Sequence, residues 1–125
     1  MKPRLLIVED EPHLCELYAL EFGEEGYDAF CVHTVAAARE ALAAGPCAAV
    51  ILDVQLPGCS GLELLDEIKQ KGAAGCPVVL FSAYATHRES RAGQLADAVL
   101  TKSGNLTELK DTVKRIISTT APPAA

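Results

Sequence analysis

Short apolar runs alternate along the chain with stretches in which apolar residues recur every three or four positions. The first pattern predicts β-strands and the second predicts amphipathic helices. Strands are predicted at residues 5–8, 28–32, 48–52, 78–81 and 98–100. Helices are predicted at residues 12–25 and 34–44, and after Ser60, Thr86 and Asn105. The chain is therefore predicted to contain five strands that alternate with five helices.

Strands separated by helices are typical of a parallel sheet that is covered on both faces. The run at residues 48–52 is continuously apolar, which predicts a strand buried on both faces. The length of 125 residues fits one domain. We expect one flavodoxin-like, doubly wound α/β domain with a five-stranded parallel sheet in the order 2-1-3-4-5 and five helices. Residues 1–117 would form this domain, and residues 118–125 a flexible tail or linker stub.

Composition narrows the classes of function. The net charge of −6 argues against a DNA-binding surface, which needs a basic face. No apolar run approaches the ~20 residues that cross a bilayer. The apolar run behind Met1 stops at Glu9, which is too short for a signal peptide. We expect a cytoplasmic protein without direct contact to nucleic acid or membrane.

The cysteines and histidines show no ligand spacing. No pair of cysteines forms a C-x-x-C motif, and no histidine stands at a zinc-ligand distance from them. The five cysteines, namely Cys15, Cys31, Cys47, Cys59 and Cys76, are expected to be reduced and to act as small hydrophobic residues. His13, His33 and His87 are expected at the surface.

Residues with chemical function follow four of the predicted strands. Glu9 and Asp10 follow the first strand, Asp53 the third, Ser82 the fourth and Lys102 the fifth. Ligands of open α/β sheets bind at the carboxyl ends of the strands. We therefore expect an acidic group, a hydroxyl and an ammonium to meet at one edge of the sheet.

These residue types fit phosphoryl transfer to an aspartate. Converging carboxylates repel one another, and Mg²⁺, which needs only one or two carboxylate ligands, relieves that repulsion. Aspartate is a known phosphoryl-accepting nucleophile, and a lysine and a hydroxyl can neutralise the phosphoryl oxygens. Each residue alone has an ordinary explanation, such as favourable charge near a helix N-terminus for the acidic residues. Their combination at four strand ends is what indicates a site.

The motifs around these residues resemble the response-regulator receiver family of two-component signalling. They are LIVEDEP at residues 6–12, LDVQLPG at 52–58 with Gly61 behind it, FSA at 81–83 and LTK at 100–102. The resemblance extends from Arg4 to about Ile117 and so covers nearly the whole chain.

The resemblance implies that Asp53 accepts a phosphoryl group from a sensor histidine kinase or a phosphotransfer protein. Ser82 would bind a phosphoryl oxygen, and Lys102 would form an ion pair. The implied Mg²⁺ ligands are Glu9, Asp10, Asp53 and the backbone carbonyl of Gln55. The domain would be a signalling module rather than an enzyme, because it promotes only its own phosphorylation and dephosphorylation. Its output would be a downstream protein target or a C-terminal output domain absent from this chain.

Three positions depart from the family pattern. Ser103 stands where a proline usually follows the lysine, so a trans peptide bond is the default there. Val99 stands where an aromatic residue usually switches on activation, and residues 95–97 replace a glycine. Gln55 and Tyr84 fall where the family tunes dephosphorylation. These departures leave the acidic residues intact but make the usual aromatic switch incomplete.

Two alternatives follow from these observations. A phosphorylation-independent interaction module, or pseudo-receiver, is motivated by Val99 and Ser103. A flavodoxin-like FMN protein is disfavoured, because the acidic first turn would repel the FMN phosphate. The helix predicted after Thr86 contains Gly93 and few apolar residues, so we expect it to be the segment that responds to phosphorylation.

Overall fold

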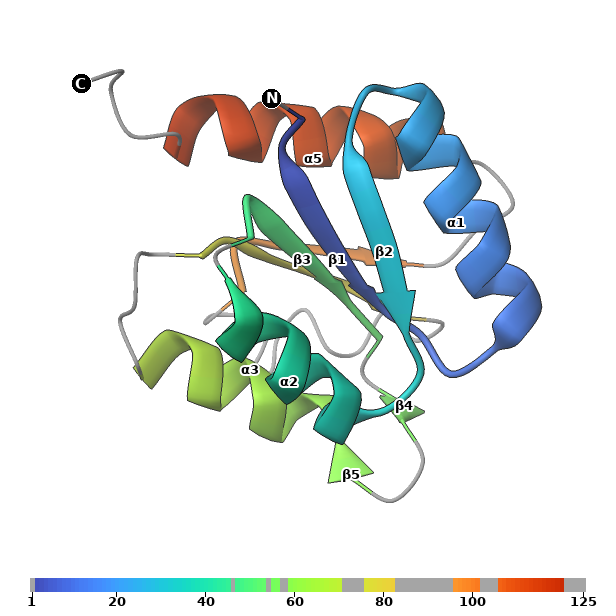
Figure 1. Ribbon diagram of the computed structural model, residues 1–125. Helices are drawn as coiled ribbons and strands as arrows, with labels where there is room; N and C mark the ends of the chain where they lie inside the picture. Colours follow the sequence, from blue (N-terminus) through green and yellow to red (C-terminus); the bar gives the residue numbers. More distant parts are fainter. Residues whose placement is uncertain are drawn as a thin grey trace.

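The computed structural model describes residues 2–45, 47–53, 55–56, 59–70, 76–82, 96–101 and 106–120 (Figure 1). Its strands are β1 (Arg4–Val8), β2 (Asp28–Val32), β3 (Ala49–Leu52), β4 (Gln55–Leu56), β5 (Cys59–Ser60), β6 (Val78–Ser82) and β7 (Ala98–Thr101). Its helices are α1 (Pro12–Glu24), α2 (Val35–Ala44), α3 (Gly61–Gln70) and α5 (Thr107–Thr120). The helix predicted after Thr86 lies outside the described residues.

Five parallel strands form the main sheet, in the order β2-β1-β3-β6-β7. Because β6 and β7 are the fourth and fifth strands of this sheet, the predicted order 2-1-3-4-5 is confirmed. Figure 1 shows α1 and α5 over one face of the sheet and α2 and α3 over the other. The doubly wound α/β prediction is therefore correct.

The two faces of the sheet carry separate apolar clusters. Side chains alternate between the faces along a strand. In β1, Leu6 and Val8 pack with α2 and α3, whereas Leu5 and Ile7 pack with α1 and α5. All four residues of β3 are buried. The continuous apolar run that predicted a strand covered on both faces is thus explained by helices on both sides.

Local signals fix several helix ends. Pro12 stands in the first turn of α1, where its missing N–H has no helical partner to lose. The side-chain oxygen of Thr34 accepts a hydrogen bond from the Ala37 N–H at 3.0 Å and so caps α2, as predicted. Gly26 adopts a φ of +97°, a conformation that suits glycine and turns the chain from α1 into β2.

Two features differ from the expected elements. A small antiparallel hairpin pairs β4 with β5 directly after β3, and strands of two residues are too short to give a periodic pattern. Helix α5 continues to Thr120, beyond the boundary predicted at residue 117. Residues 121–125 of the predicted tail lie outside the described residues. Among the described helices, none is long and apolar enough to span a bilayer.

The expectation that all cysteines are reduced is wrong for one pair. Cys15 of α1 and Cys31 of β2 form a disulfide bond, with their Cα atoms 5.7 Å apart. Cys47 and Cys76 are free thiols, and both are half-buried. The spacing of Cys15 and Cys31 in the sequence does not indicate the bond, because only the packing of α1 beside β2 brings them together.

Candidate metal centre

The candidate site begins where β1 and β3 end side by side. Val8 pairs with Leu52 in the parallel ladder, so the residues that follow, Glu9 and Asp53, leave the sheet together. The Asp53 N–H donates to the Val8 carbonyl at 3.0 Å, and the Glu9 N–H donates to the Val32 carbonyl at 3.0 Å. The backbones of both acidic residues are therefore held by the sheet itself.

Three carboxylates converge at this edge, and we refer to Glu9, Asp10 and Asp53 as the acidic cluster. Each offers an oxygen, and these oxygens lie within 4.8 Å of one another. Glu9 is 2% exposed and Asp53 6% exposed, whereas Asp10 faces solvent. Converging carboxylates away from water repel one another strongly, and hard oxygen donors are the ligands that Mg²⁺ prefers. The donor set therefore fits a Mg²⁺ ion with one side open to solvent.

Two contacts orient Glu9 within the cluster. The Glu11 N–H donates to Glu9 Oε2 at 3.2 Å. Nδ1 of His33 lies 3.2 Å from the Glu9 carbonyl oxygen, and since a carbonyl only accepts, Nδ1 carries the proton in this contact. His33 is exposed, as predicted, but no motif in the sequence marks its contact with Glu9. His33 directly follows β2. The rule that ligands bind at the carboxyl ends of the strands (the strand-end rule), which indicated the acidic residues, could therefore also have indicated His33.

The other predicted site residues are described only in part. Ser82 is the last residue of β6 and pairs with Thr101 of β7 in the same parallel sheet, so its backbone stands at the carboxyl edge. Gln55 lies in β4, two positions after Asp53. Lys102 lies outside the described residues. The structure thus brings Glu9, Asp10 and Asp53 together, while the roles of all the predicted site residues stay predictions.

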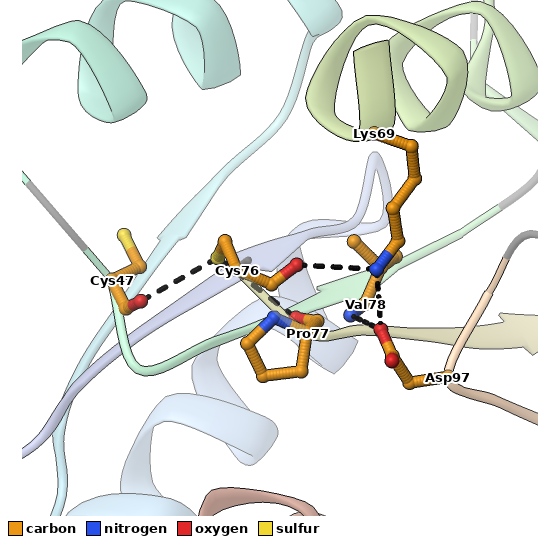
Figure 2. A network of polar contacts seen from close by, with 6 residues as sticks. All are labelled: Cys47, Lys69, Cys76, Pro77, Val78 and Asp97. Carbon is orange, nitrogen blue, oxygen red and sulfur yellow. Dashed lines mark hydrogen bonds and ion pairs between the residues drawn. The ribbon is translucent and has the colours of Figure 1, made fainter. Parts of the chain in front are cut away.

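A second polar network lies at the opposite, amino edge of the sheet (Figure 2). Asp97 is one of the three residues, 95–97, that stand in place of the glycine that the resembled family has before β7. Its Oδ2 accepts hydrogen bonds from Lys69 Nζ and from the Val78 N–H, each at 2.7 Å. The Cys76 thiol donates to the Cys47 carbonyl at 3.4 Å. Burial, followed by the nearby Cys47, raises the pKa of Cys76 to about 11. A thiol that stays protonated is a poor nucleophile, so Cys76 is expected to react slowly.

Comparison with known proteins identifies the family. Residues 5–114 match the family model of the response regulator receiver domain. The chain therefore belongs to the response regulator receiver family, the signalling module of two-component systems.

Individual relatives agree with this assignment. The chain is 40% identical over 111 residues to the transcriptional regulatory protein TcrA of Mycobacterium tuberculosis, covering 85% of this chain and 42% of TcrA. It spans from 28% to 52% of the lengths of several curated relatives that it matches. The response regulator TrrA of Thermotoga maritima, in complex with Mg²⁺-BeF, superposes with a TM-score of 0.86 at 38% identity, over 93% of this chain and 99% of TrrA. TrrA in complex with the histidine kinase ThkA superposes with a TM-score of 0.84 at 38% identity, over 93% of this chain and 98% of that one.

Proposed function

We propose that the chain accepts a phosphoryl group on Asp53 in a Mg²⁺-dependent phosphorelay and signals through phosphorylation-dependent protein interaction. The observation that carries the proposal is the position of Asp53. Its backbone is fixed at the end of β3, it is 6% exposed, and its carboxylate lies within 4.8 Å of oxygens of Glu9 and Asp10. An ordinary surface aspartate would not be held beside two other acids at the edge of a buried strand.

The proposed reaction transfers the phosphoryl group from a phosphohistidine to Asp53. A carboxylate oxygen of Asp53 attacks the phosphorus, the bond between phosphorus and the imidazole nitrogen breaks, and the electron pair of that bond stays on the nitrogen. The product is an acylphosphate on Asp53, which water later hydrolyses to regenerate the carboxylate. The hydroxyl of Ser82 would donate to a phosphoryl oxygen, and the ammonium of Lys102 would pair with the phosphorylated aspartate.

Glu9, Asp10, Asp53 and the backbone carbonyl of Gln55 would hold the Mg²⁺ ion. When bound, the ion neutralises negative charge on the phosphoryl oxygens and on the carboxylates. The side chain of Asp10 faces solvent, which leaves room for the waters that Mg²⁺ usually keeps. The similar protein TrrA supports a Mg²⁺ site in this chain, because its crystal structure is a complex with Mg²⁺-BeF.

The proposed donor is a sensor histidine kinase or a phosphotransfer protein in the cytoplasm. Support comes from the complex of the similar protein TrrA with the histidine kinase ThkA. The output would be a downstream protein or an output domain, since TcrA is a transcriptional regulatory protein more than twice as long as its region of similarity. The net charge of −6 argues against direct binding of this domain to nucleic acid.

Incubation with acetyl phosphate and Mg²⁺ tests the acceptor residue. We expect an intact-mass gain of one phosphoryl group, lost in the Asp53→Asn variant and when EDTA replaces Mg²⁺. Asp28→Asn is the matched control, because Asp28 is an exposed aspartate at the amino end of β2, away from the acidic cluster. Samples are quenched within minutes in the cold, because acylphosphates hydrolyse. A wild-type protein that gains no mass, or an Asp53→Asn variant that gains as much, would refute the proposal.

Val99 favours a second function, that of a phosphorylation-independent interaction module. Val99 lies in β7, half-buried against the apolar cluster on the α2 and α3 side, where the family usually has a switching aromatic residue. This alternative predicts that a partner captured by the wild type binds the Asp53→Asn variant with the same affinity, and that phosphorylation leaves that affinity unchanged. The leading proposal predicts a difference in both comparisons.

A further inference from the structure

The disulfide between Cys15 and Cys31 lies beside the acidic cluster, on two elements that both contact Glu9. Cys31 precedes Val32, whose carbonyl accepts the hydrogen bond from the Glu9 N–H at 3.0 Å. Cys15 donates its own N–H to the Glu11 carbonyl at 2.9 Å, and the Glu11 N–H donates to Glu9 Oε2. The crosslink therefore closes a ring of contacts around Glu9, with β2 on one side and the first turn of α1 on the other.

Without this bond, hydrogen bonds and packing alone hold the first turn of α1 against the edge strand. Glu9 and Asp10 lie in the segment that joins β1 to α1, so any movement of that turn away from β2 also moves these carboxylates. A site whose ligands are held in place binds more tightly than one whose ligands must first be ordered. The presence or absence of the Cys15–Cys31 bond is thus expected to affect the positions of the carboxylates in the acidic cluster.

The two sulfurs differ in exposure in a way that suits reversible exchange. Cys15 is 3% exposed, whereas Cys31 is half-buried on β2, an edge strand with a neighbour in the sheet on one side only. Cys31 is therefore the sulfur that an external thiol or disulfide can reach, and Cys15 is the partner that resolves the exchange. Disulfides in reducing compartments are usually transient and redox-sensing rather than permanent.

We propose that Cys15 and Cys31 form a reversible redox modification site that tunes Mg²⁺ binding by the acidic cluster, an inference that rests on the proposed function. The oxidant is a low-molecular-weight disulfide. The Cys31 thiolate attacks one of its sulfurs, forming a mixed disulfide and releasing one small thiol. The Cys15 thiolate then attacks Cys31 Sγ, forming the protein disulfide and releasing the second small thiol. The protein loses two electrons and two protons, which the small disulfide gains.

The first measurement establishes the bond. The protein is treated with oxidised glutathione or with dithiothreitol, freed of reagent, unfolded and alkylated with iodoacetamide. Since two of the five cysteines are joined, we expect three alkyl groups on the oxidised protein and five on the reduced one. A peptide map should show residues 15 and 31 linked. Five alkyl groups after both treatments, or a link between other cysteines, would overturn the proposal.

The second measurement tests the coupling by calorimetric titration of both forms with Mg²⁺. We expect the oxidised form to bind Mg²⁺ more tightly, by about three- to tenfold, because its ligands are already ordered. The Cys31→Ser variant should show no difference between the two treatments, and Cys15→Ala repeats the test if Cys31→Ser folds poorly. Cys76→Ser is the control that should keep the difference, because Cys76 lies at the opposite edge of the sheet.

The outcomes separate the two proposals. Equal Mg²⁺ affinity of the oxidised and reduced forms, or tighter binding by the reduced form, refutes the redox coupling and leaves the proposed function standing. Absence of Mg²⁺ binding by both forms refutes the metal site of the proposed function, and the coupling with it.

Discussion

Replacing Asp97 by alanine removes one carboxylate that joins three elements at the amino edge of the sheet. Asp97 Oδ2 accepts hydrogen bonds from the N–H of Val78, the first residue of β6, and from Nζ of Lys69 near the end of α3 (Figure 2). Asp97 itself stands directly before β7, and its N–H donates to the Val78 carbonyl at 2.8 Å. The perturbation therefore tests what an aspartate contributes where the family usually has a glycine nearby.

The two interactions of the carboxylate have different expected magnitudes. The substitution takes a charged acceptor away from the Val78 N–H. Because Val78 is fully buried, this loss costs about 1.5 to 3 kcal/mol. The ion pair with Lys69 is worth about 0.2 to 1 kcal/mol, because the two side chains are 23% and 32% exposed. Asp97→Ala should therefore lower the free energy of unfolding by about 2 to 3 kcal/mol.

Two milder variants separate the contributions. Asp97→Asn keeps a neutral oxygen acceptor for Val78 and loses the ion pair, so it should cost about 1 kcal/mol. Lys69→Gln removes the ion pair and leaves the carboxylate in place, so it should cost about 1 kcal/mol or less. The order of destabilisation is then Asp97→Ala first, with Asp97→Asn and Lys69→Gln close together behind it.

Urea unfolding followed by far-ultraviolet circular dichroism measures these differences, since the chain contains no tryptophan for fluorescence. The slope of the unfolding free energy against urea should stay unchanged, which shows that the variants unfold from comparable states. The reasoning is wrong if Asp97→Asn costs as much as Asp97→Ala, because the unsatisfied N–H of Val78 would then not account for most of the loss. It is equally wrong if Lys69→Gln matches Asp97→Ala.

Three further predictions concern single features. Reducing the Cys15–Cys31 bond should lower the free energy of unfolding by about 3 kcal/mol, as expected for a closed loop with a sequence separation of 16, and urea curves with and without dithiothreitol should differ accordingly. Thr34→Ala removes the acceptor of the Ala37 N–H and should lower the free energy of unfolding by about 1 kcal/mol in the same assay. Thr34→Ser keeps a hydroxyl and should lower it by less. Equal losses in the two variants would contradict a capping role. The pKa of Cys76 is raised from 9.0 to about 11 in the fold, so at pH 8 its alkylation should be about a hundredfold slower in the native protein than in urea. Since the fold favours the protonated thiol, the contribution of Cys76 to stability is complete below pH 9 and is lost as the pH rises towards 11.

The sheet could be predicted because its signal is local and strong. Residues 5–8 of β1 and all of β3 are continuously apolar, a pattern typical of strands buried on both faces, and the alternation of strands with helices predicts a parallel sheet. The hairpin of β4 and β5 could not be predicted, since two-residue strands carry no periodicity. The disulfide could not be predicted for a different reason. Its formation depends on how α1 packs beside an edge strand, which is a property of the tertiary structure alone.

The same contrast holds for the site. The strand-end rule found Glu9, Asp10 and Asp53 because the parallel register places the ends of β1 and β3 side by side. The contact of His33 with the Glu9 carbonyl follows the same rule but carries no motif that marks it. The role of Asp97 had no signal in the sequence, because its partners, Lys69 and Val78, are 28 and 19 positions away.

Two of the departures from the family pattern, Asp97 and Val99, lie away from the acidic cluster, and this separation bears on how the domain signals. Val99 lies in β7, the strand at one end of the sheet order, where it pairs with Leu80 and packs against the apolar cluster on the α2 and α3 side. A valine is restricted about its first side-chain torsion, so it cannot swing between a buried and an exposed position as a large aromatic ring can. The proposed phosphoryl acceptance by Asp53 depends on groups at the carboxyl edge, whereas Val99 lies within β7. We therefore expect that any output of the proposed phosphorylation does not use a side-chain swing at position 99. Phosphorylation and partner binding consequently have to be measured separately for this receiver domain, because success in the first does not imply the second.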